Sequence, residues 1–179
     1  FMACTRLNSI TIPEGVTSIG ASAFENTGWY NEQKDGLVYL YNYLLGLKGV
    51  NKPTNIVIKD GTMTIADQAL SNCLSLVSIT IPASVNSIGA EVFMDCESLA
   101  SITVAEENTI YESPDNCNAI IEKSTHTLLW GCENTVIPNT VTRINTDAFR
   151  WHTGLTSITI PESVTSIGDG AFQATGLTS

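Results

Sequence analysis

The stretch that decides the fold runs from Cys73 to Asp95, and its sequence is C-L-S-L-V-S-I-T-I-P-A-S-V-N-S-I-G-A-E-V-F-M-D. The next segment begins in the same way at Cys96, so that Ile102 follows Ile79 by one period of 23 residues. Repeats of 20 to 50 residues are typical of solenoids, propellers and arrays. This period therefore predicts a stack of similar coils.

Copies of the unit occur along the whole chain. Each copy has an I-x-I core, in most copies a proline, then an apolar residue, an isoleucine, a glycine and an Ala-Phe pair. The cores are Ile10/Ile12, Ile56/Ile58, Ile79/Ile81, Ile102/Val104, Thr135/Ile137 and Ile158/Ile160. The phenylalanines of the Ala-Phe position are Phe24, Phe93, Phe149 and Phe172. We expect these four rings to stack as a ladder inside the coils.

The order of residues within the unit predicts a short strand. Alternation places Leu76, Ile79 and Ile81 on the inner side and Ser78 and Thr80 on the outer side. Proline cannot donate to a sheet ladder, so it ends the strand. The glycine after the next isoleucine predicts a positive φ, and the isoleucine itself is a second buried anchor. One unit cannot bury its own apolar face, whereas stacked units can.

The inferred fold is a right-handed repeat solenoid of β-rich parallel coils with short helical or 3-10 turns. Two segments interrupt the period, at about residues 29–54 and 106–134. In the first, Leu37–Leu40 and Tyr43–Leu47 flank Tyr41-Asn42 and predict a β-hairpin. This insertion is one repeat long, so a degenerate coil is the alternative. In the second, residues 119–123 and 127–131 flank a turn at 124–126 and predict another hairpin.

Composition narrows the classes of function. The 179 residues carry a formal net charge of −10, and the few basic residues form no stripe, which argues against nucleic-acid binding. No run of 18 apolar residues exists, so no membrane span is predicted. The chain begins and ends inside a repeat unit. We therefore expect residues 1–179 to be one solenoid domain that is part of a longer array.

Cysteines and titratable residues give no catalytic motif. Cys4, Cys73 and Cys96 share one repeat position and are expected to form a buried ladder of free thiols. Cys117 and Cys132 flank the second hairpin, which leaves open both free thiols and a disulfide in an oxidising compartment. The spacing of histidine, cysteine and acidic residues matches no known metal loop. We expect no enzyme activity, no metal and no cofactor.

At this point a family resemblance is clear. Units of the form L-x-S-I-x-I-P-x-x-V-x-S-I-G-x-x-A-F-x-x-C resemble the treponemal-type repeat of BspA-type leucine-rich-repeat proteins, and the resemblance covers essentially the whole chain. It implies a secreted or surface-anchored bacterial protein that adheres to host matrix or to other cells. The family has no common catalytic residues to carry over, and no motif defines its ligand contacts.

Candidate contact residues follow from the distribution of aromatic side chains. Tyrosine and tryptophan are enriched at interaction hot spots, and most of them lie in the insertions rather than in the coils. The candidates are Trp29, Tyr30, Tyr39, Tyr41, Tyr43 and Trp130, together with Thr80 and Thr103 on the outer strand face. The alternative is that the rings only pack the hairpins against the coils. The predicted partner is an extracellular protein or glycan, and the alternative function is a spacer that holds another domain away from the cell surface.

Overall fold

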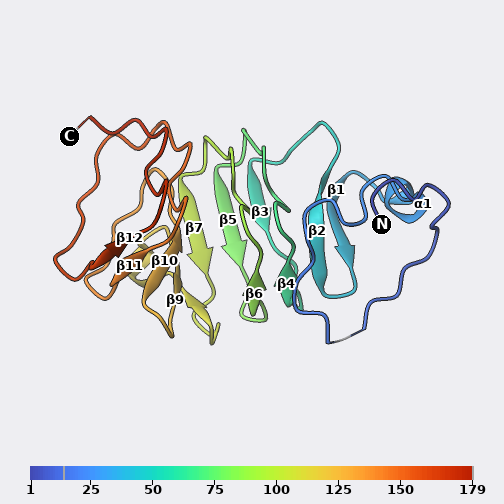
Figure 1. The fold of residues 1–179 in the computed structure, drawn as a ribbon, viewed down its shortest axis with the longest axis horizontal. Helices are drawn as coiled ribbons and strands as arrows, with labels where there is room; N and C mark the ends of the chain where they lie inside the picture. The colour runs from blue at the N-terminus through green and yellow to red at the C-terminus, as the bar shows by residue number, and fades with distance from the viewer. Residues whose placement is uncertain (14, 179) are drawn as a thin grey trace.

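The computed structural model describes residues 1–13 and 15–178. The chain winds into an elongated stack of coils, and its two termini lie at opposite ends (Figure 1). Neighbouring coils pair through short parallel strands, which confirms the solenoid predicted from the repeat. In the described residues, helix is confined to α1 (Gly28–Glu32) and the 3-10 segment η1 (Pro114–Asn116).

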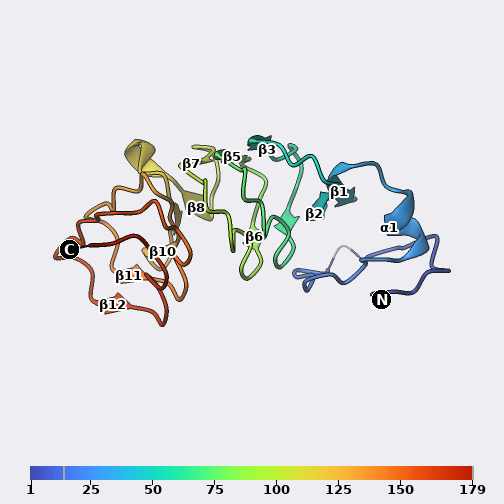
Figure 2. The same cartoon turned by 90° about the horizontal axis from the view of Figure 1, so that it is seen from above.

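Three of the six I-x-I cores, at Ile56, Ile79/Ile81 and Ile102/Val104, form a three-stranded parallel sheet along one side of the stack (Figure 2). The other three cores form no strand, so the predicted strand is confirmed only for the central coils. Its strands are β3 (Asn55–Val57), β5 (Ser78–Ile81) and β7 (Ser101–Val104). In β5 the side chains of Ile79 and Ile81 are buried, while Ser78 and Thr80 are half-exposed on the outer face. The strand ends immediately before Pro82, as predicted.

Two further sheets form the second wall, and each contains one insertion. The first has the order β1-β2-β4-β6, and the other has the order β12-β11-β10-β9-β8. The strands of the first are β1 (Gly36–Leu40), β2 (Tyr43–Lys48), β4 (Thr64–Ile65) and β6 (Ser87–Ile88). Those of the other are β8 (Tyr111–Glu112), β9 (Ile120–Glu122), β10 (Thr127–Trp130), β11 (Arg143–Ile144) and β12 (Ser166–Ile167). The pairs β1/β2 and β9/β10 are antiparallel, so both predicted hairpins are confirmed.

The interior divides into two apolar clusters, and the division lies at the second insertion. Leu44 of the first hairpin belongs to the larger cluster, among the isoleucines of the neighbouring coils. Ile120 of β9 also belongs to that cluster, whereas its neighbour Ile121 and Leu128 of β10 belong to the smaller one. The first insertion is thus part of a continuous core, and the second lies between two cores.

The phenylalanine ladder is present only in part. Phe24, Phe93 and Phe149 are buried, and Phe149 stacks on Phe172 with ring centroids 5.1 Å apart. The ladder is not continuous, because Leu70 occupies the ring position between Phe24 and Phe93. The prediction of buried rings is confirmed for these three but not for Phe172, which is half-buried, and the prediction of one uninterrupted stack is wrong.

The expected positive φ at the repeat glycines is wrong. Positive φ values occur instead two residues later, for example at Glu91. A Cβ added to Gly89 would lie 2.5 Å from the backbone nitrogen of Asp67, and one added to Gly168 would overlap Thr146. Glycine is required at these positions because the backbone of the preceding coil approaches closely.

Two expectations about burial also need correction. Cys73 and Cys96 are buried, and the Cys96 thiol donates to the Leu70 carbonyl at 3.2 Å, but Cys4 is exposed. Cys4 lies in the first of the described coils, and none of the other described coils covers it. Ile88 is only half-buried because β6 is the edge strand of its sheet.

Candidate functional site: the insertions and their slots

The first insertion is a true hairpin that takes the place of one coil strand. Its turn is Tyr41-Asn42, and Tyr41 has a φ of 55°. Strand β2 continues in parallel with β4, so that Leu44 pairs with Ile65 at the anchor position of the repeat. The degenerate-coil alternative is therefore correct for one wall only, and the remainder of the insertion is a hairpin.

Two tyrosine hydroxyls of this hairpin attach it to the flanking coils. The Lys59 N–H donates to the Tyr39 hydroxyl at 3.1 Å, and the Tyr43 hydroxyl donates to the Val16 carbonyl at 2.7 Å. Tyr43 is buried, whereas Tyr41 at the tip is 61% exposed and has only a long, 3.4 Å hydrogen bond to the first coil. Tyr39 and Tyr43 therefore pack, and Tyr41 presents its ring to solvent.

Helix α1, which the sequence analysis missed, places the other two aromatic candidates of this insertion. The half-buried Trp29 ring lies edge-on to Phe24 with centroids 6.5 Å apart. The Lys48 ammonium donates to three carbonyls at the end of α1 and lies 5.7 Å from the Tyr30 ring centroid. Burial, together with the nearby Glu25 carboxylate, raises the pKa of Tyr30. Trp29 therefore packs against Phe24 of the first coil, and Tyr30 packs against Lys48 of the hairpin.

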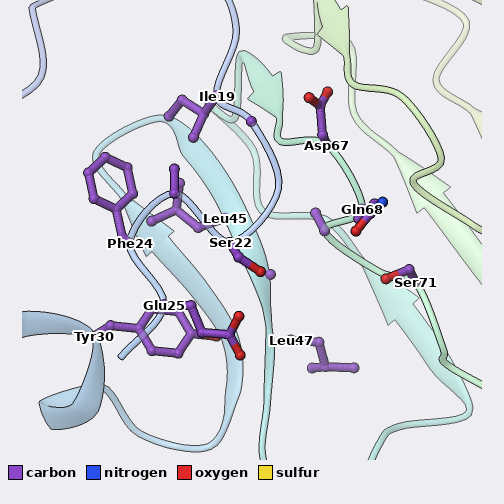
Figure 3. Close-up of a pocket in the computed structure, with 14 residues that line it drawn as sticks. Ile19, Ser22, Phe24, Glu25, Tyr30, Leu45, Leu47, Asp67, Gln68 and Ser71 are labelled. Carbon is purple, nitrogen blue, oxygen red and sulfur yellow. The ribbon is translucent and has the colours of Figure 1, made fainter. Parts of the chain in front are cut away.

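A cavity of about 170 Å³ opens where the first insertion separates two coils. We call it slot 1. Figure 3 shows Ser22 and Glu25 along one side and Gln68 and Ser71 along the other, and Leu45 of β2 also lines the cavity. The two sides are the turns that would contact each other in an uninterrupted stack.

One buried amide, that of Asn108, attaches the start of the second insertion to the preceding coil. Its Nδ2 donates to the carbonyls of Pro82 and Val85 at 3.1 and 2.8 Å, and its Oδ1 accepts from the Tyr111 N–H at 2.7 Å. The Lys123 ammonium donates to the backbone carbonyl of the same residue at 2.6 Å. The sequence analysis missed Asn108 because it matches no motif.

A second cavity, of about 260 Å³, opens beside this insertion, and we call it slot 2. The half-buried Trp130 ring lines it and lies edge-on to Phe93, with centroids 6.2 Å apart. The other side carries the Arg150–Asp147 ion pair, 3.3 Å long, and the buried His152. Burial lowers the pKa of His152 to about 4, so its imidazole is neutral at pH 7.

The remaining candidates lie on a different surface. Thr80 and Thr103 are register neighbours on the outer face of β5 and β7, in line with the exposed Val57 of β3. This face, the tip at Tyr41 and the slot at Trp130 are separate regions. The structure does not gather the predicted contact residues into one site.

The five cysteines are free thiols. The Cys132 thiol donates to the Asn118 carbonyl at 3.3 Å rather than bonding to Cys117. Burial raises the pKa of both thiols, that of Cys132 to about 11. Across residues 1–13 and 15–178, no three His, Cys, Asp or Glu side chains are grouped so as to hold a metal ion. No helix within that span has the length and apolar character needed to cross a membrane.

Comparison with known families gives one clear match. The model of the BspA type leucine rich repeat region matches residues 1–34, 47–127 and 119–179, with 6 copies. The chain belongs to this family. Its members are leucine-rich-repeat proteins, which in general are protein-interaction modules and are not known as enzymes. No curated protein matches the chain at a significant level.

Solved structures agree with the fold. A leucine-rich-repeat protein from Eubacterium ventriosum is 27% identical, with a TM-score of 0.55 over 66% of this chain and 32% of that one. The pneumococcal vaccine antigen PcpA is 19% identical, with a TM-score of 0.53 over 67% of this chain and 36% of that one. The chain thus spans about a third of the length of these two relatives.

Proposed function

We propose that the chain is a non-enzymatic binding module, secreted or displayed on a bacterial surface, that attaches to an extracellular protein or glycan through the tip of its first hairpin. Membership of a family of interaction modules supports the general class. Adhesion to host matrix or to other cells is the finer role that we assign.

The observation that carries the choice of surface is the exposure of Tyr41. Every other tyrosine or tryptophan of the two insertions is buried or half-buried, whereas Tyr41 is held outward by its turn. The exposed Met63 lies beside the turn, since its backbone N–H donates to the Asn42 carbonyl at 2.8 Å. An exposed tyrosine next to a methionine is a composition that interface cores favour.

The test compares two pairs of surface substitutions in the binding of the purified chain to immobilised matrix glycoproteins and arrayed glycans. The Tyr41→Ala/Met63→Ala variant removes the tip surface, and Val57→Ala/Thr103→Ala removes a similar area of the outer sheet face. Tyr43 is unsuitable for this purpose because it is buried and bonded. All variants are first checked for an unchanged melting temperature.

We expect the tip variant to lose binding by at least about tenfold while the sheet-face variant binds as the parent does. The opposite result would assign the binding to Thr80, Thr103 and their neighbours. If the parent binds no member of either panel, the spacer alternative is favoured over adhesion.

A further inference from the structure

Regular junctions between coils share one pattern of backbone hydrogen bonds along the wall that carries the Ala-Phe turns. In each junction, alternate N–H groups of one coil donate to carbonyls of the next. At one junction Gln68, Leu70 and Asn72 donate to Ala90, Val92 and Met94, at 2.9, 3.2 and 2.8 Å. At another, Asp147, Phe149 and Trp151 donate to Asp169, Ala171 and Gln173, at 3.0, 2.8 and 3.0 Å. Peptide groups therefore hold this wall together at every regular junction, with side-chain hydrogen bonds such as that from Gln68 to Glu91 added to them.

The second insertion breaks this pattern at slot 2. The equivalent donors are the N–H groups of Glu91, Phe93 and Asp95, and within the described part of the chain none of them has a hydrogen-bond acceptor. The insertion supplies no turn here. Instead, β10 ends at Trp130, and the Gly131 N–H donates directly to the carbonyl of the following coil, at Ala148.

The width of slot 2 follows from the missing turn. Neighbouring chains in a sheet lie about 4.8 Å apart, so a skipped position leaves about 9.6 Å between backbones, which is the space that one extended chain fills. In a regular coil a phenylalanine of this turn would pack against Phe93. Here the Trp130 ring fills that place and packs edge-on against Phe93. An occupant therefore needs a backbone and small side chains rather than a phenylalanine.

The far side of slot 2 carries polar atoms that lack partners. His152 is only 4% exposed, and its Nδ1 has no hydrogen-bond partner among the residues described. The Arg150 Nε is likewise buried without a partner. In another coil the residue at the same repeat position has a hydrogen-bond partner, because the Thr27 hydroxyl donates to the Phe24 carbonyl at 2.8 Å. Buried polar atoms are rarely left unpaired, so this side of the slot is poorly satisfied in the free chain.

We propose that slot 2 binds an extended peptide segment of a partner protein, which adds to the Glu91–Asp95 edge in place of the missing turn. Its carbonyls accept from the N–H groups of Glu91 and Phe93, and its small side chains cover the Trp130 ring. Addition of a chain to an unpaired backbone edge is a common mode of peptide recognition. Slot 1 has the same unpaired donors at Ser22 and Phe24, but it has no comparable buried side chain without a partner.

The test starts from a phage-displayed random heptapeptide library selected on the parent chain. Selected peptides are measured by calorimetry against Ala90→Trp and Thr146→Trp, which fill slot 2 from its two sides. The matched control is Ala83→Trp, because Ala83 is another exposed alanine of the same coil and does not line the slot. Hydrogen exchange of the Glu91 and Phe93 amides is followed by NMR with and without peptide.

We expect the parent and Ala83→Trp to bind the peptides equally, both slot-filling variants to bind at least about tenfold more weakly, and both amides to gain protection. Equal binding by all variants, or binding without amide protection, overturns the proposal. So does a selection that yields no peptide specific for the parent, or displacement of the selected peptides by monosaccharides and disaccharides. The Tyr41→Ala/Met63→Ala variant should retain peptide binding, because the tip and slot 2 are separate surfaces.

Discussion

The two insertions are both antiparallel hairpins whose second strand joins a parallel sheet, β2 beside β4 and β10 beside β11. They differ in attachment and surroundings. Two tyrosine hydroxyls attach the first within a continuous core, whereas the buried Asn108 attaches the second between two cores. A hairpin can thus replace the strand of a coil but not its Ala-Phe turn. Both insertions therefore leave a slot in the wall that carries these turns.

The largest expected effect is on stability. It compares the contribution of a ring beside the second insertion with that of a ring in the last coil. Replacing the buried Phe93 by alanine should lower the free energy of unfolding by about 3–5 kcal/mol, because it removes the partner of Trp130 and leaves a cavity. Phe172→Ala, at a half-buried ring, should cost about half as much. Urea denaturation measures both values. Equal costs would contradict the unequal burial of the two rings.

The next prediction compares the two attachments directly. Asn108→Ala should destabilise the chain by about 3 kcal/mol, since it leaves two carbonyls and two N–H groups unpaired in a buried place. Tyr43→Phe removes one hydroxyl and should cost about 1 kcal/mol. Equilibrium unfolding of each variant checks the difference. A larger loss for Tyr43→Phe would show that the first insertion is the more dependent on its polar attachment.

A matched pair of glycines sharpens the comparison further. A Cβ at Gly131 would overlap the Phe149 ring, so Gly131→Ala should cost about 2–3 kcal/mol through overpacking. At Gly46 of the first hairpin the added Cβ would lie 3.6 Å from the Ala69 carbonyl oxygen, which is an ordinary contact. Gly46→Ala should therefore change stability by less than about 1 kcal/mol. Thermal unfolding separates the two outcomes.

The smallest effect is the acid sensitivity of the smaller core. His152 is buried with a pKa of about 4, below the ordinary value of about 6.5, so the unfolded chain binds its proton first as the pH falls. Stability should decline from about pH 6.5 towards pH 4, by about 2 kcal/mol between pH 6.5 and 5. His152→Thr, which copies Thr27 at the same repeat position, should lose this component. Parallel pH dependences for parent and variant would contradict it.

The sequence alone determined the repeat and, in the central coils, the features that depend on local alternation. The inward isoleucines of β5, the end of the strand at Pro82, both hairpins and the exposed turn at Tyr41 follow from patterns of neighbouring residues. These features need only the period of the chain, because a β-strand with one buried face must alternate and a proline must end its ladder.

Only the tertiary structure decided what each coil meets on its two sides. Gly89 and Gly168 are required by the close approach of the neighbouring coil, and Asn108 pairs with carbonyls more than 20 positions away. Slot 2 exists because a turn is missing between two coils. The Ala-Phe turn of one coil has its N–H groups paired with the next coil, as at Gln68 and Leu70. The equivalent N–H groups of Glu91 and Phe93 are unpaired. The physical reason is that hydrogen bonds between coils depend on the adjacent chain, which the residues of a single repeat do not specify.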